Sequence, residues 1–543
     1  MSRCSTQTVV LGFDALSRKY LETFDLPNFD SLRERGASAS LRSTFPPWTG
    51  SAWPSLYTGV DPSHHGVYSF FDFENGYPNE ADLISRKDVR APAIWDYLTD
   101  EGVSAVVLNM PVTHPADAID GAIVPGYLAP EDAVGYPREI RSELTDALGE
   151  TYRIYATDET GSPDDEMLRS YVDLIDLRRR AARTLLQTRE PDVAILQVQK
   201  TDTVFHQFDD RTAFRRVYEA ADSFLGTILE TVDEDANVIV CSDHGIGPTR
   251  GYNIYINEIL REAGFVEETY DGETPMFGDS KHRLANDTDG EEESSAVATR
   301  AMSGLATALG SVGIQPGDVY TIAQRVGVGE SLRRLLPAHT DALARHVDWS
   351  DSRAYCRSGP ELGVRINVEG REPDGVVPPE QYESVRDDVI ETLSGVRTPN
   401  GEPAFEWVKR REEVYDGPYA GEACDVLFQP AGMNHIVATN LLGKQFISID
   451  KHNHKSDGVF IGAGPAFAAQ SDTEQLSLTD VAPMVLALAG CPVPERMTGS
   501  IPPSLLTTSH ETRPYADLQY GTGTVTTDDD DQVEARLEDL GYL

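Results

Sequence analysis

The 543-residue chain has few cysteines and no long apolar run. Its five cysteines are Cys4, Cys241, Cys356, Cys424 and Cys491. Their odd number and wide separation argue against a disulfide framework and against a zinc site built from cysteines. No stretch approaches the roughly 20 apolar residues of a membrane span, and no apolar signal segment precedes the first strand. We therefore expect a cytoplasmic protein without a membrane partner.

Basic residues are also scarce. The chain has 46 Lys and Arg against 89 Asp and Glu, which gives a formal net charge of -43. Acidic clusters at 163–166, 233–235 and 289–293 show that the acidity is spread along the sequence and is not confined to one tail. This pattern is typical of halophiles, because molar salt shortens the Debye length to about 3 Å. A nucleic-acid partner held by a basic face is not expected.

Three short apolar segments are each followed by potential metal ligands. Residues 8–13 lead to Asp14, residues 193–198 lead to Asp202, and residues 238–242 lead to Asp243 and His244. In open α/β sheets, ligands bind beyond the carboxyl ends of the strands, so these side chains are expected to meet there. His206 follows Asp202 by four residues, which places both on one face of a helical turn. Any one of them could cap a helix, but the repetition favours a metal site.

Thr49 is the candidate nucleophile. It follows two prolines, Pro46 and Pro47, and precedes small residues that can begin a helix. A threonine at a helix start is commonly an N-cap. In the catalytic interpretation, backbone N–H groups at the helix start hold a developing oxyanion, and an adjacent divalent metal removes the hydroxyl proton.

These motifs together resemble the alkaline phosphatase superfamily, in its type I phosphodiesterase/nucleotide pyrophosphatase branch. The resemblance is carried by a nucleophile loop, a His-Gly motif after it and two later metal motifs. They lie at 49–59, 62–67, 242–245 and 454–460, with softer matches at 109–113, 366–373, 479–483 and 490–494. It covers nearly the whole chain apart from roughly residues 265 to 350, and an ordered set of motifs is more specific than any one.

The resemblance implies a doubly wound, mostly parallel α/β sheet with an inserted cap, and a two-metal site. One metal would be held by Asp202, His206 and His454, and the other by Asp14, Asp243, His244 and the Thr49 oxygen. Mixed Asp and His ligands suit zinc, and manganese or iron could use the same set. The implied mechanism passes through a covalent phosphothreonine.

Three features depart from relatives of this kind. An Asn that helps to hold the oxyanion in nucleotide pyrophosphatases aligns with Phe70, whose side chain has no hydrogen-bond donor. No arginine clamp of the kind that phosphomonoesterases use can be assigned; Arg357, Arg371 and Lys451 are candidates, and a surface or salt-bridged role is the commoner one for such residues. The sulfatase Cys-x-Pro-x-Arg signature is absent around Thr49, so sulfate ester hydrolysis becomes a minor alternative.

The motifs suggest three segments. Residues 1–260 and 425–510 are expected to form the catalytic core, and residues 261–424 an inserted cap and return segment. Within the insertion, 272–295 is expected to be a surface loop and 296–343 to contain helices. Residues 511–543 form an acidic tail with the run Asp528 to Asp531 and an amphipathic segment at 533–540.

The leading hypothesis is a metal-dependent hydrolase of phosphodiesters or phosphomonoesters, with a small phosphate ester as substrate. A phosphomutase or phosphotransferase is the alternative, because a phosphothreonine can also pass its phosphoryl group to an alcohol. A non-catalytic binding protein is a weaker alternative, since no ligand of the site is missing. The oligomeric state is left open.

Overall fold

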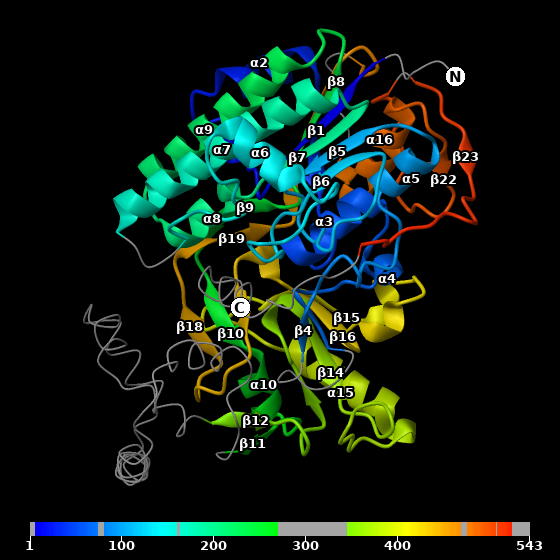
Figure 1. Ribbon diagram of the computed structural model, residues 1–543. Coiled ribbons are helices and arrows are strands. Elements are labelled where there is room, and N and C mark those ends of the chain that lie inside the picture. Colours follow the sequence, from blue (N-terminus) through cyan, green and yellow to red (C-terminus); the bar gives the residue numbers. More distant parts are fainter. Residues whose placement is uncertain are drawn as a thin grey trace, which may run out of the picture.

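The computed structural model describes residues 6–73, 81–159, 163–269, 345–468, 475–506 and 508–523. A large sheet with helices on both faces forms one part of the molecule, and a smaller lobe of short sheets lies beside it (Figure 1). Among the described residues, no helix is long and apolar enough to cross a membrane. The sequence segments 272–295, 296–343, 528–531 and 533–540 lie outside the described residues.

The large sheet has eight strands in the order β21-β2-β20-β8-β1-β7-β5-β6. Their bounds are β1 (Thr8–Phe13), β2 (Ala37–Arg42), β5 (Ala105–Leu108), β6 (Gly121–Val124), β7 (Val193–Val198), β8 (Asn237–Cys241), β20 (Asp457–Ala463) and β21 (Leu476–Ser477). Only β20 runs against its neighbours. The predicted mostly parallel α/β sheet is therefore confirmed.

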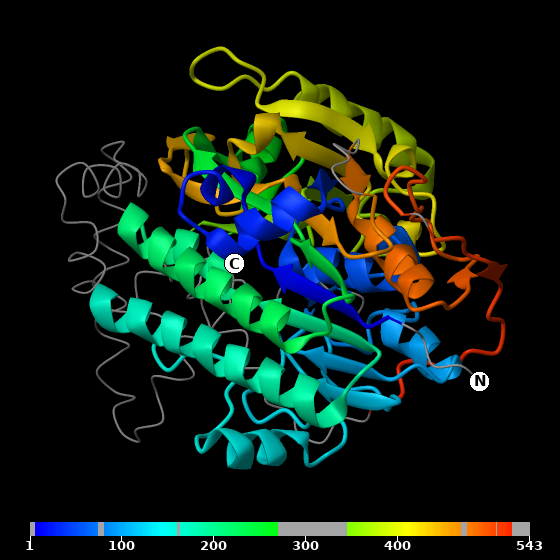
Figure 2. The same cartoon turned by 90° about the horizontal axis from the view of Figure 1, so that it is seen from above.

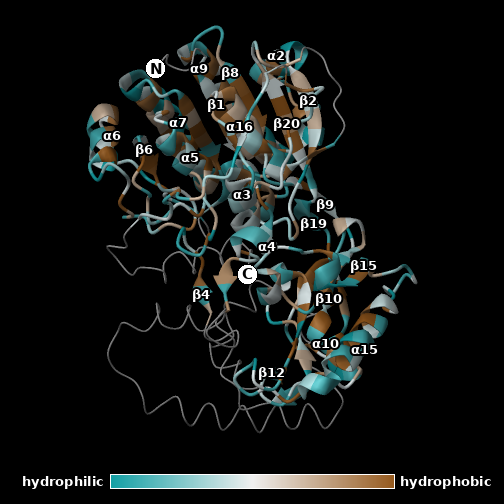
Figure 3. Cartoon of the chain, turned by 90° about the vertical axis from the view of Figure 1, so that its right-hand side faces the viewer, coloured by the Kyte–Doolittle hydropathy of each residue, from teal (hydrophilic) through white to brown (hydrophobic). Residues whose placement is uncertain are grey.

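Helices cover both faces of this sheet, as its continuously apolar strands require. On one face lie α2 (Pro27–Arg35), α6 (Ile140–Leu148), α7 (Asp164–Arg189), α8 (Lys200–Gln207) and α9 (Arg211–Thr231), and on the other lie α3 (Thr49–Thr58), α5 (Ile94–Asp100) and α16 (Val481–Leu488). In β1, Val9 and Leu11 pack toward the first set and Val10 toward the second. Figure 2 shows α7 and α9 side by side across their face, and Figure 3 shows the apolar residues concentrated in the sheet.

The smaller lobe contains a four-stranded antiparallel sheet and a three-stranded sheet. The first consists of β13 (Ala354–Tyr355), β14 (Gly363–Ile366), β16 (Val426–Pro430) and β15 (Phe405–Arg410), and the second of β17 (Ile436–Ala438), β10 (Tyr252–Tyr255) and β18 (Phe446–Ser448). Beside them lie α10 (Ile256–Glu262), α15 (Tyr382–Ser394) and the pair β11 (Glu267–Thr269) and β12 (His346–Asp348). The described part of 261–424 lies in this lobe, which also includes β10, most of α10 and β16 to β18.

A two-stranded ribbon joins the lobe to the large sheet. The chain leaves through β9 (Gly245–Thr249) and returns through β19 (Lys451–Lys455), and the two strands pair antiparallel. The remaining short elements are α1 (Arg18–Leu21), α4 (Pro62–His65), β3 (Phe71–Asp72), β4 (Asp82–Leu83), β22 (Val493–Pro494) and β23 (Thr512–Arg513). The ribbon begins directly after Asp243 and His244 and carries His454, so it connects the lobe to the predicted ligands.

Candidate metal-dependent active site

The predicted ligands meet at the carboxyl ends of three neighbouring strands. Asp14 follows β1, Asp202 lies in the first turn of α8 after β7, and Asp243 with His244 follows β8. His454 reaches the same place from β19, which lies beside α8 and β9 below the sheet (Figure 1). All five side chains are fully buried.

Asp14, Asp243 and His244 form one group of ligand atoms, which lie within 4.8 Å of one another. His244 Nε2 is 3.5 Å from Asp14 Oδ1 and 3.3 Å from Asp243 Oδ2. His244 Nδ1 lies 3.0 Å from the carbonyl oxygen of Gly245, to which it can donate, and this leaves the lone pair of Nε2 directed at the carboxylates. These three facing atoms have no hydrogen-bond partner within the described part of the chain.

Asp202, His244 and His454 form the second group, so His244 is shared by both. Asp202 Oδ1 lies 3.6 Å from His454 Nε2. The predicted partner His206 lies on the same face of α8 as Asp202, with its Nε2 3.3 Å from Asp202 Oδ1 and 3.1 Å from His454 Nε2. The structure therefore brings all six predicted Asp and His ligands together.

Thr49 is the first residue of α3, and Trp48 occupies the N-cap position. Thr49 Oγ1 is buried and has no hydrogen-bond partner among the described residues, so the threonine does not act as an N-cap. The Trp48 ring lies 4.6 Å from the His454 ring, and Pro47 O lies 3.2 Å from His454 Nδ1. Thr49 thus begins its helix beside the second metal group.

Burial and mutual repulsion perturb the acidic groups. Burial raises the pKa of Asp14 well above its ordinary value, and the charges of Asp243 and Asp202 raise it further. Burial likewise raises the pKa of Asp243, to about 6. For Asp202, burial acts to raise the pKa, but the interactions with His206, His454 and His244 together outweigh it and lower the pKa to about 2. Burial and the neighbouring His244 hold the pKa of His454 well below its usual range.

These observations fit divalent cations. Three carboxylates that repel one another in a buried space have a charge balance that a cation improves. The oxygen and nitrogen donors are those that zinc, manganese and iron share. The buried polar atoms without hydrogen-bond partners would otherwise each cost about 1 to 3 kcal/mol.

The sequence from residue 8 to residue 455 matches a family model described as Type I phosphodiesterase / nucleotide pyrophosphatase. The chain belongs to this family. No curated protein matches the sequence. Membership of the type I phosphodiesterase family supports phosphate-ester hydrolysis as the class of reaction and metal dependence as its requirement.

Two solved structures show the same fold. Phosphonoacetate hydrolase from Sinorhizobium meliloti 1021, in complex with phosphonoformate, aligns with a TM-score of 0.53 and 17% identity over 89% of this chain and 96% of that chain. Human ectonucleotide pyrophosphatase / phosphodiesterase 5 aligns with a TM-score of 0.50 and 14% identity over 91% and 97%. At these identities the likeness concerns the fold, which is that of the alkaline phosphatase superfamily.

Two residues that support the site were not predicted. Trp53 Nε1 donates to Asp14 Oδ2 over 3.1 Å, and Gln197 Nε2 donates to the same oxygen over 3.2 Å. Trp53 lies four residues after Thr49, so both share one face of α3. A tryptophan in an apolar helix gives no sign in the sequence that its indole N–H reaches a carboxylate.

His65, in the His-Gly motif after the nucleophile loop, has a structural role. It is fully buried, its Nδ1 accepts from the Val67 N–H over 3.2 Å, and its Nε2 lies 2.9 Å from Ser55 Oγ. Burial lowers its pKa to about 3, so the ring is neutral. Because Ser55 belongs to α3, His65 fixes α4 and the following loop against the helix that carries Thr49.

The arginines considered as a clamp are engaged elsewhere. Arg357 is paired in a bidentate manner with Glu361 at 2.8 and 2.7 Å, and Arg371 pairs with Asp425. Phe70 is fully buried in the main core, where it packs against Gly50. The position that the sequence resemblance aligned with an oxyanion-holding amide is therefore part of the apolar core.

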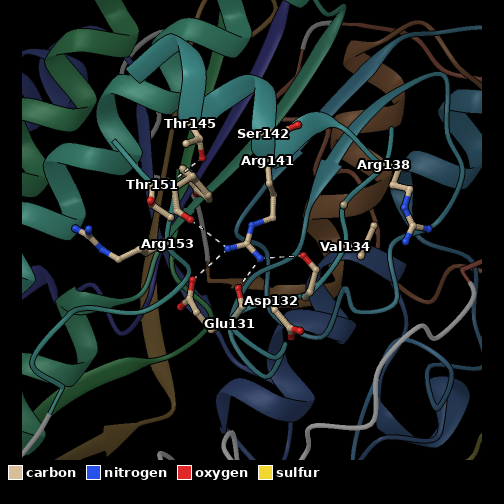
Figure 4. A pocket seen from close by; sticks show the side chains of 12 residues that line it. Glu131, Asp132, Val134, Arg138, Arg141, Ser142, Thr145, Thr151 and Arg153 are labelled. Atoms are coloured by element: carbon tan, nitrogen blue, oxygen red, sulfur yellow. Dashed lines mark hydrogen bonds and ion pairs between the residues drawn. The ribbon is translucent and has the colours of Figure 1, made fainter. Parts of the chain in front are cut away.

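A cleft of about 750 Å³ lies away from the metal ligands, at the start of α6. Arg141 crosses it and donates to the Glu131 carboxylate and to the carbonyl oxygens of Glu131, Ala133 and Tyr152, while Arg153 points away from the centre (Figure 4). The donors of Arg141 are thus used within the protein.

Proposed function

We propose that the chain is a two-metal phosphodiesterase that uses Thr49 as its nucleophile. The supporting observation is the convergence of five buried Asp and His side chains and the partly exposed His206, from three strand ends, α8 and β19, beside the start of α3. Family membership supplies the class of reaction. The phosphothreonine intermediate and the preferred ester are the specific parts of the proposal.

Each residue of the site has a separate role in the proposed mechanism. Thr49 Oγ1 attacks phosphorus in line, the bond to the leaving alkoxide breaks, and water later hydrolyses the phosphothreonine. The first N–H groups of α3 lack intrahelical partners, so they are available to a phosphoryl oxygen. Bound divalent cations would supply charge stabilisation and lower the pKa of the threonine hydroxyl. Trp53 and Gln197 hold Asp14 in one orientation.

A diester fits this site better than a monoester. A monoester presents an additional negative charge, which monoesterases neutralise with a cationic side chain. Arg357 and Arg371 are both committed to carboxylates, so neither is available as that clamp. A singly charged diester needs less compensation beyond the cations themselves.

The test compares hydrolysis of bis(p-nitrophenyl) phosphate and p-nitrophenyl phosphate in high salt, with zinc or manganese and with a chelator. The variants are Thr49→Ala and Thr49→Ser, and the control is Thr188→Ala, which changes an exposed threonine on α7. We expect metal-dependent turnover with a preference for the diester. Thr49→Ala should abolish it, Thr49→Ser should retain a measurable part, and the control should match the wild type.

Acid quenching during turnover should trap phosphate on the peptide that contains Thr49. Equal turnover by Thr49→Ala in metal-loaded protein would contradict the nucleophilic role. Transfer of the phosphoryl group to an added alcohol at the expense of hydrolysis would instead support the phosphotransferase alternative. A preference for the monoester would contradict the argument from the engaged arginines.

A further inference from the structure

A second cleft, of about 570 Å³, lies at the start of β19. Its walls come from α1, the start of α9, β9 and β19. It contains four cationic side chains, Lys19, Arg211, Arg250 and Lys451, and two carboxylates. The chain has a net charge of -43, whereas in this cleft the cationic side chains outnumber the carboxylates.

Within the described part of the chain, three of these cations have no ion pair. Arg250 is 3.2 Å from Asp450, but no carboxylate oxygen of the described residues lies within 4.0 Å of Lys19, Arg211 or Lys451. Lys19 lies over the Tyr20 ring at 5.2 Å and Arg211 over the Phe24 ring at 5.8 Å. Such contacts use the face of a ring and leave the N–H donors available, so the cleft presents unused donors and positive charge.

The three residues are distant in sequence and on separate elements. Lys19 is on α1, Arg211 begins α9 and Lys451 begins β19. Like-charged side chains repel one another, and a folded chain gains nothing from gathering them without a partner. Asp209 and Asp450 also line the cleft, yet no carboxylate of the described residues pairs with any of these three cations, which points to an anionic ligand.

We propose that this cleft binds a phosphate group at a site separate from the metal ligands. Lys and Arg donors that line one cleft suit tetrahedral phosphate oxygens. The group could be a second phosphate of the substrate or free phosphate. Tyr20, which lines the cleft, contacts His452 at 2.8 Å, and the His452 ring lies 5.2 Å from that of Phe205, the neighbour of His206. The cleft is therefore separated from the metal ligands by one layer of rings.

The binding test uses inorganic phosphate and calorimetry on the full chain, at constant ionic strength, once with metals bound and once with excess chelator. We expect two equivalents of phosphate to bind with metals and one to remain with chelator. Arg211→Gln and Lys451→Gln should each weaken the chelator-resistant site about tenfold or more, and Lys451→Arg should retain it. Arg215→Gln is the control, because it removes the same charge from an exposed position on α9 that pairs with Glu219.

The result with chelator is independent of the proposed function, because it needs neither metal nor turnover. The proposal would be overturned if no phosphate bound in the presence of chelator. It would also be overturned if the wild type, Arg211→Gln and Lys451→Gln bound phosphate equally tightly under that condition. Folding of each variant is checked by thermal unfolding.

Kinetics then distinguish the two sources of the group. If the phosphate group that binds in the cleft is part of the substrate, Lys451→Gln raises KM for esters with a second phosphate and leaves KM for bis(p-nitrophenyl) phosphate unchanged. If free phosphate is the ligand, the variant changes only inhibition by phosphate. Either pattern supports the site, whereas identical kinetics in every assay would contradict its role next to the metals.

Discussion

Replacing Trp53 by phenylalanine tests how the protein orients its first metal group. The substitution removes the indole N–H that donates to Asp14 Oδ2 over 3.1 Å and leaves an aromatic ring in the core. A hydrogen bond to a charged group contributes about 1.5 to 3 kcal/mol, and each 1.4 kcal/mol is a factor of ten in affinity. Gln197 still donates to the same oxygen, so the lower part of this range applies. We expect metal affinity to fall by about 10- to 30-fold, within the span for residues that orient metal ligands.

The matched control is Trp95→Phe. Trp95 is also fully buried, and its Nε1 donates to Asp117 Oδ2 over 3.1 Å, at a position outside the metal groups. Asp117 likewise keeps a second donor, Arg86. Both variants lose comparable packing, so their unfolding temperatures should fall to a similar extent. Metal titrations should separate them, with weaker binding in Trp53→Phe alone.

The reasoning is refuted if both variants bind metal as tightly as the wild type, or if both lose the same affinity. The first result would mean that Asp14 keeps its orientation without the indole. The second would mean that affinity follows overall stability. A Gln197→Met variant, which removes the other donor to Asp14, should resemble Trp53→Phe.

Three further outcomes follow from charge and burial. The raised pKa of Asp243, about 6, keeps the metal-free carboxyl protonated at lower pH, so protons compete with the metal for this ligand. Metal affinity should therefore rise between about pH 5 and about pH 7 in metal titrations at constant salt. A metal affinity that does not change with pH would contradict the raised pKa of Asp243. The unfolding temperature should rise between about 0.1 M and about 2 M potassium chloride, since screening shortens the reach of repulsion within a chain of charge -43; an unchanged midpoint would remove the basis for the halophilic interpretation. His65→Ala should lower the free energy of unfolding by about 2 to 4 kcal/mol through two lost hydrogen bonds and a cavity, with metal affinity in the folded protein unchanged.

The sequence was informative where local patterns determine position. Strands at 8–13 and 193–198 were predicted with the bounds that β1 and β7 have, because both faces of these strands are buried and their residues are almost all apolar. A ligand placed directly after such a strand can only emerge at one edge of a parallel sheet, so the meeting of Asp14, Asp202 and Asp243 could be predicted from their spacing alone.

Contacts between distant segments could not be predicted in this way. The donors to Asp14 come from α3 and β7, and their direction depends on the packing of Trp53 against Gly12, where any Cβ would lie 2.5 Å from the indole ring. The cationic cleft gathers Lys19, Arg211 and Lys451 from three elements that are far apart along the chain. The antiparallel insertion of β20 between β2 and β8 likewise depends on tertiary pairing.

The smaller lobe is attached to the large sheet by a ribbon whose strands adjoin or contain metal ligands. β9 starts immediately after His244, and His454 lies within β19, opposite Ile246. A rotation of the lobe about this ribbon would displace the imidazoles of His244 and His454, whose rings stack at 3.9 Å. Cations held between His244, His454 and the carboxylates would fasten the base of the ribbon. Cation binding at the proposed site would therefore also join the base of this ribbon to the large sheet, because His244 and His454 belong to both.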